Sequence, residues 1–161
     1  MQGDVIRDTP VPRFGQQYAD NKVAAQWVPM RLIVLTQSCD LVSREGQVNE
    51  VFLCRVLDAV EVFTQEGHWS KQAKGRFKNA KAGRYPDLHL FHDWEDPNDP
   101  KKAKVADFRQ VFSVPLGYLE THAARLGSRP RLHSPYREHF SQAYARYHMR
   151  VGLPSDLPNI A

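Results

Sequence analysis

The polar segment Thr36-Gln37-Ser38-Cys39-Asp40 is the first place in the chain where side chains could do chemistry. It follows the apolar run 32–35, and polar residues at the end of a buried strand are held rigidly enough to form a site. A cysteine such as Cys39 becomes a nucleophile when a base or a positive charge lowers its pKa. The plainer interpretation is a structured turn in which Ser38 and Asp40 bond to the local backbone. Gln37 and Cys39 are therefore candidate site residues, with the turn as the alternative.

A basic segment over residues 71–84 suggests a second kind of site, one that binds nucleic acid. Spaced cations suit a phosphate backbone, and the nearby rings of Phe77 and Tyr85 offer surfaces for base stacking. A merely solvated basic surface is the alternative, and the apolar neighbours of Phe77 favour a place in the core for that ring. The segment contains no acid, and its candidate nucleic-acid-binding residues are Lys71, Lys74, Arg76, Lys78, Lys81 and Arg84.

Two further groups of polar residues are weaker candidates. His89, His92 and Asp93 are the right types for a metal, but a spacing of three places the histidines on opposite faces of a strand. Because no Cys-x-x-Cys or His-Glu-x-x-His motif supports them, we predict no metal site and no cofactor.

Arg137 lies in the first turn of the last predicted helix, where the helix dipole disfavours a positive charge. We expect a compensating partner. An acid such as Asp40 or Asp107, a bound phosphate, or a simple salt bridge would each serve.

The elements that must position these residues follow from the apolar pattern, beginning with the first half of the chain. Prolines 10 and 12 are expected to end a short strand at 3–6, and residues 9–30 are expected to form an irregular loop. The apolar, β-branched run 31–36 predicts a central strand buried on both faces. Residues 49–63 predict a second long strand, bent near Asp58.

The second half of the chain alternates helix and strand signals. Trp69, Ala73, Phe77 and Ala80 share one face of a helix predicted over 67–81. Strands are predicted at 88–91 and 104–114, with a strong turn signal at 96–100 between them and a short helix or turn from Pro115. A last amphipathic helix is predicted over 135–151, with Ser134 as its N-cap and Gly152 ending it. Its face of Tyr136, Phe140, Ala143, Tyr144, Tyr147 and Val151 must pack on the sheet or on a second copy.

Composition sets the class of protein. With 161 residues, of which 42% are hydrophobic, we expect one α+β domain over 1–161 with its own core. The net charge is +4, a weak pointer towards nucleic acid. No leader or membrane span is apparent, and the two cysteines are expected to be free thiols, with Cys54 in the core. Together these features predict a cytoplasmic protein without a membrane partner.

Three segments resemble the PemK/MazF family of small barrel toxins. Gly3-Asp4-Val5-Ile6 is similar to the Gly-Asp-Ile-Val start of that family. The strand 31–36 is similar to a family strand that follows a basic residue and ends in Ser or Thr. Residues 107–114 with 116–119 resemble its penultimate strand and short helix, and a terminal helix closes both. The Arg-Pro pair that precedes the strand in the family is absent, and the insert at 67–85 is longer than a minimal toxin needs.

The resemblance implies a small, mostly antiparallel SH3-like β-barrel with a basic helical insert, usually as a homodimer. Many members cleave single-stranded RNA without a metal, using an arginine that holds the scissile phosphate and a nearby hydroxyl or carboxylate. By position, Arg31, Thr36 and Asp40 are the matching candidates for catalysis.

The resemblance therefore leads to a toxin-like RNA-binding barrel or endoribonuclease as the first hypothesis. The alternative is a protein-interaction or regulatory subunit of a bacterial defence or toxin system, which docks a protein partner through its last helix. A cysteine enzyme built on Cys39 is a third hypothesis.

Overall fold

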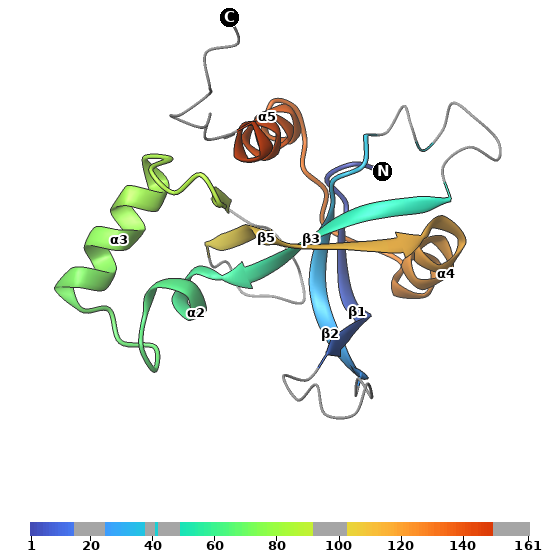
Figure 1. Cartoon of the computed structure of the whole chain (residues 1–161), viewed down its shortest axis with the longest axis horizontal. Coiled ribbons are helices and arrows are strands. Elements are labelled where there is room, and N and C mark those ends of the chain that lie inside the picture. The colour runs from blue at the N-terminus through green and yellow to red at the C-terminus, as the bar shows by residue number, and fades with distance from the viewer. Residues whose placement is uncertain (15–24, 38–40, 42–48, 92–102, 150–161) are drawn as a thin grey trace, which may run out of the picture.

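The computed structural model describes residues 1–14, 25–37, 41, 49–91 and 103–149, which are drawn as ribbon and sticks in the figures. Figure 1 shows a central sheet with helices around it. In chain order the elements are β1 (Val5–Phe14), β2 (Ala25–Val34), β3 (Glu50–Asp58), α2 (Ala59–Phe63), α3 (Lys71–Lys81), β4 (Leu88–Phe91), β5 (Lys104–Pro115), α4 (Leu116–Leu126) and α5 (Tyr136–His148).

The five strands form one antiparallel sheet in the order β1-β2-β3-β5-β4, which confirms the α+β class. β2 and β3 pair only over 32–34 with 53–55, and Figure 1 shows the β1–β2 pair running crosswise to β3 and β5. Two irregularities help to turn the strands. One extra residue lies in β1 between Ile6 and Thr9, and residues 108–110 bulge from β5 opposite Cys54 and Arg55. Within the described residues β1 and β4 do not pair with each other, so the sheet is not closed.

The first half of the chain corrects our prediction of a short strand and a long irregular loop. β1 continues through Pro10 and Pro12, and β2 already begins at Ala25. Pro10 pairs with Pro29, and both can be accommodated where neither backbone nitrogen needs to donate across the pair. β1 is an edge strand, and β2 does not pair with β3 at Pro29. The absence of an N–H group at each proline therefore removes no hydrogen bond from the sheet.

The central part of β2 is buried on both faces, as its apolar run predicts. Ile33 and Cys54 belong to the hydrophobic cluster covered by α5, whereas Leu32, Val34 and Leu53 belong to the cluster covered by α4. These side chains are at most 1% exposed, and the alternation follows from the two-residue period of a strand. The expected core position of Cys54 is confirmed.

Two further boundaries differ from the prediction. The strand expected over 49–63 ends at Asp58, and residues 59–63 turn into α2, whose Ala59 and Phe63 face a third cluster with Val105. The short helix expected from Pro115 runs on to Leu126, because Leu119 and Ala123 repeat its apolar face. The predicted strands at 88–91 and 104–114 are confirmed, and the turn signal at 96–100 lies outside the described residues.

The last helix packs on the sheet of its own chain. Phe140 is fully buried, and Ala143, Tyr144 and Tyr147 contact the same cluster, with the Tyr144 ring 5.4 Å from that of Phe108. Tyr136, predicted on this face, is 66% exposed. The N-cap position is Pro135 rather than Ser134, with no side-chain cap, and Val151 and Gly152 lie outside the described residues. No helix in the described part of the chain is long and apolar enough to cross a membrane.

Candidate nucleic-acid interface

The basic helix α3 is anchored at its start and along one face. The Ser70 hydroxyl caps it by accepting a hydrogen bond from the Ala73 N–H at 3.1 Å. Ala73 and Ala80 are buried, and Phe77 packs edge-on against Phe63 and Trp69, with centroids 5.6 and 5.3 Å away. Ala73, Phe77 and Ala80 thus form the predicted apolar face, but the helix begins at Lys71 rather than at residue 67, so Trp69 packs on this face from before the helix. The half-buried Phe77 belongs to this packing rather than to a stacking surface.

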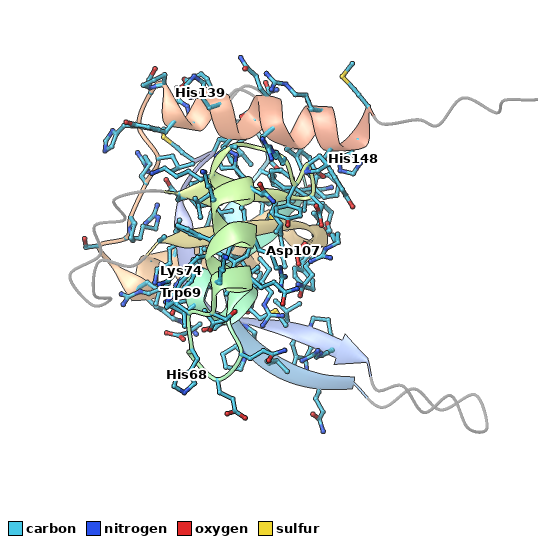
Figure 2. All side chains as sticks on the ribbon, turned by 90° about the vertical axis from the view of Figure 1, so that its left-hand side faces the viewer. His68, Trp69, Lys74, Asp107, His139 and His148 are labelled. Atoms are coloured by element: carbon cyan, nitrogen blue, oxygen red, sulfur yellow. The ribbon has the colours of Figure 1, made fainter. Side chains whose placement is uncertain are left out.

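All six cations of this segment are exposed. The helical spacing places the four lysines of α3 on the side away from Ala73, Phe77 and Ala80, whereas Arg76 lies beside that apolar face and Arg84 follows the helix. Arg76 reaches the Val62 carbonyl and lies over the Phe63 ring, and Arg84 donates to Asn79, so these two are held in place. α3 itself contains no acid, and within the described residues no carboxylate pairs with its four lysines. Figure 2 looks onto this helix, with Lys74 on it and α5 lying above. Among the described residues, the lysines therefore give this side of α3 one sign of charge.

A cavity of about 410 Å³ opens where α3 has ended, between β4 and α5. Tyr85, Leu88 and His89 line it from the α3–β4 side, and His139, Gln142 and Arg146 line it from α5. The His89 ring is half-buried beside Phe91 and Phe140, with centroids 5.0 and 5.5 Å away. Burial, and then the charge of His139, lower the pKa of His89 to about 4, so this imidazole is neutral at physiological pH.

Arg31, a candidate catalytic residue, lies in a different hollow of about 230 Å³ on the β1–β2–β3 side of the sheet. Its guanidinium contacts the Asp58 carboxylate at 3.4 Å, and that carboxylate also binds the buried Lys104 ammonium. Two more arginines and two more acids line the same hollow: Arg7, Arg55, Asp8 and Glu61. This mixed set of charges is a weaker phosphate site than the face of α3, because the acids offset the cations.

Thr36 is not brought near Arg31. Its hydroxyl accepts a hydrogen bond from the Phe52 N–H at 2.8 Å, which continues the pairing beyond the end of β2. Arg31 lies within β2, whereas Thr36 lies at a bend two residues beyond its end, and the five steps between them span at most about 16 Å at the usual rise of a strand. Gln37 follows in an exposed position, while Cys39 and Asp40 lie outside the described residues. Within the described part of the chain, Thr36 does not line the hollow that contains Arg31.

The partner of Arg137 is its neighbour in the helix. Arg137 donates to Glu138 at 2.8 Å, and this hydrogen bond lowers the pKa of the Glu138 carboxyl. Asp107 is engaged elsewhere: Arg109 and Gln110 both bond to its carboxylate. The simple salt bridge, one of the alternatives for Arg137, is therefore the one that forms.

Sequence reasoning missed the cavity residues of α5. His139, Gln142 and Arg146 follow at spacings of three and four, which places them on one helical face, and this was the available signal. What the spacing could not show is that β4 lies opposite this face and brings His89 to it.

Comparisons with known proteins found no family model and no curated protein that matches this chain. Among the described residues, no three His, Cys, Asp or Glu side chains are grouped so that they could hold a metal ion.

Proposed function

We propose that this chain binds single-stranded RNA, and that α3 provides the main contact surface. The observation that carries the proposal is the row of exposed cations on a helix without acids, fixed to the sheet by Ala73, Phe77 and Ala80. A rigid row of positive charge favours a flexible polyanion, since each neutralised phosphate releases condensed counterions.

We also propose that the chain adopts the small SH3-like barrel fold of the PemK/MazF toxins. Several features support it: the crosswise arrangement of β1–β2 and β3–β5, the bulges that turn β1 and β5, and the helix α4 that directly follows β5. Small β-barrels of this kind serve both as nucleases and as binding modules, so fold alone does not decide between cleavage and binding. The homodimer that the resemblance implies is tested by light scattering.

The experiment measures affinity for a labelled single-stranded RNA as a function of salt, by fluorescence anisotropy. For the double variant Lys74→Gln/Lys78→Gln we expect weaker binding at low salt. The slope of log K against log salt should become shallower by about 1.4, since each phosphate contact on a single strand contributes about 0.7. The matched control is Arg13→Gln/Arg125→Gln, which removes the same charge from exposed residues of β1 and α4 and should leave the slope nearly unchanged.

Cleavage is tested on the same RNA with EDTA present, by separating the products on a denaturing gel. Discrete fragments would extend the proposal to a metal-independent endoribonuclease. Absence of RNA binding at low salt would refute the proposal and favour the alternative, a regulatory or protein-interaction subunit. The docking face expected for that alternative is already occupied, since Phe140 and Tyr144 pack on the sheet. A partner would therefore have to use other residues, such as the exposed Tyr136.

A further inference from the structure

We propose that the cavity between β4 and α5 holds one unstacked nucleotide of the bound RNA, with its base against Tyr85 and His89 and its phosphate at His139 and Arg146. This inference rests on the proposed RNA binding and assigns to it a site for the base, which the row of lysines on α3 does not provide.

The size and the walls of the cavity fit a nucleobase. Its volume of about 410 Å³ is in the range of pockets that enclose small organic ligands. Leu88 and Pro86 contribute apolar surface, and the half-buried Tyr85 contributes a ring. Unstacked bases are commonly held against such rings in complexes with single-stranded RNA.

The polar groups are divided between the wall and the opening of the cavity. His89, on the wall, is neutral, so its imidazole has one donor and one acceptor nitrogen, a pattern that suits the edge of a base. The side-chain amide of Gln142 likewise offers both a hydrogen-bond donor and an acceptor. His139 and Arg146 are exposed on α5, where a phosphate outside the cavity can meet a ring N–H and a guanidinium.

The cavity also continues the basic face of α3. Lys78 and Lys81 stand in the last turn of that helix, and Gly83, which lines the cavity, follows two residues later. In Figure 2 α3 faces the viewer and α5 lies above it, with His139 at one end of α5. We therefore expect a strand of RNA that lies along α3 to pass Lys78 and Lys81 and to reach the opening of the cavity.

The test compares two probes of equal length, about 12 units: a mixed-sequence RNA and an abasic ribose-phosphate chain. Both contact α3, but only the RNA can fill the cavity. We expect the unmodified protein to bind the RNA about 5- to 150-fold more tightly, the usual contribution of a stacked base. Gln142→Trp, which blocks the opening, should reduce the affinity for RNA to that for the abasic chain and leave the latter unchanged.

Matched variants separate this effect from damage to the fold. Ala145→Trp places the same bulk on an exposed position of α5 away from the cavity and should behave like the unmodified protein. His139→Ala should weaken RNA binding at least 3-fold, whereas His133→Ala, at another exposed histidine, should not.

Equal affinity of the unmodified protein for both probes would overturn the nucleotide site while leaving RNA binding by α3 intact. Equal behaviour of Gln142→Trp and Ala145→Trp would overturn it as well. Failure of both probes to bind at low salt would overturn the proposed function and this inference together.

Discussion

Arg131 donates a hydrogen bond at 3.1 Å to the carboxylate of Asp4, a residue 127 positions earlier in the chain. Asp4 is 1% exposed, and Arg129 donates to it as well, at 2.9 Å. Asp4 and Arg131 also form an isolated antiparallel β-bridge. The Asp4 carboxylate therefore joins the segment just before β1 to the segment that leads into α5. The ion pairs thereby fix the position of the helix that closes the cavity.

Replacing Asp4 should therefore cost stability. We expect Asp4→Asn to lower the free energy of unfolding by about 2 kcal/mol, because its charged hydrogen bonds with the arginines are lost. The two arginines are partly exposed and can bind water instead, but the buried side chain at position 4 cannot. Urea denaturation followed by circular dichroism measures the change. Asp8→Asn is the control: Asp8 is exposed with φ +50°, a conformation that Asn accepts readily, and it should change stability by less than about 0.5 kcal/mol. Equal losses in both variants would contradict a special role for Asp4.

Phe140 should be the most sensitive position of α5. It is fully buried among Phe91, Phe108 and His89, so Phe140→Ala should lower the free energy of unfolding by about 3–5 kcal/mol. Tyr136→Ala, one helical turn earlier and 66% exposed, should change it by less than about 0.5 kcal/mol. A small effect at Phe140 would show that α5 does not pack on the sheet as described.

Stability should fall in mildly acidic solution because of His89. Its pKa is lowered from 6.5 to about 4 in the folded state, by burial and then by His139 on the facing helix. The unfolded chain thus binds a proton between these values and the folded chain does not, so stability decreases as the pH falls from about 6.5 to 4. The total decrease in the free energy of unfolding over this range is roughly 3 kcal/mol, at 1.36 kcal/mol for each unit of difference between the two pKa values.

The variant His89→Phe isolates this contribution, because it keeps a ring among Phe91, Phe108 and Phe140 but cannot take up a proton. Its unfolding free energy, measured at several pH values from 7 to 4, should depend less on pH than that of the unmodified protein. Asp4 and Asp107 do not obscure the comparison. Burial alone would raise the pKa of each carboxyl, but hydrogen bonds, chiefly from Arg131 and Arg109, lower both pKa values below 3.8. Their stabilisation is lost only in more acidic solution. Parallel curves for the two proteins would contradict the assignment.

The elements that the sequence predicted correctly are those whose pattern is local. The period of Ala73, Phe77 and Ala80 is that of a helix, and the run around Ile33 is long enough for a buried strand. The predictions that were wrong concern segments whose structure depends on their tertiary contacts. Pro10 and Pro29 are compatible with strands only because each lies beside an unpaired edge, which no local pattern reveals. In the same way, His89 was considered only as a weak candidate for a metal ligand, and only the packing of α5 on β4 brings it to one cavity with His139.

The separation of Arg31 and Thr36 leads to the last prediction. If both acted on one phosphate, as the resemblance implies, the effects of Arg31→Gln and Thr36→Val on RNA binding and cleavage would be coupled. Because Thr36 lies beyond the end of β2, up to about 16 Å along the chain from Arg31, we expect the effects to add to within about 0.5 kcal/mol in a double-mutant cycle. Thr36→Val should also destabilise the fold by about 1 kcal/mol, because the Phe52 N–H loses its acceptor. A coupling above about 1 kcal/mol would show that the two side chains meet on the RNA after a rearrangement, and would restore them as a catalytic pair.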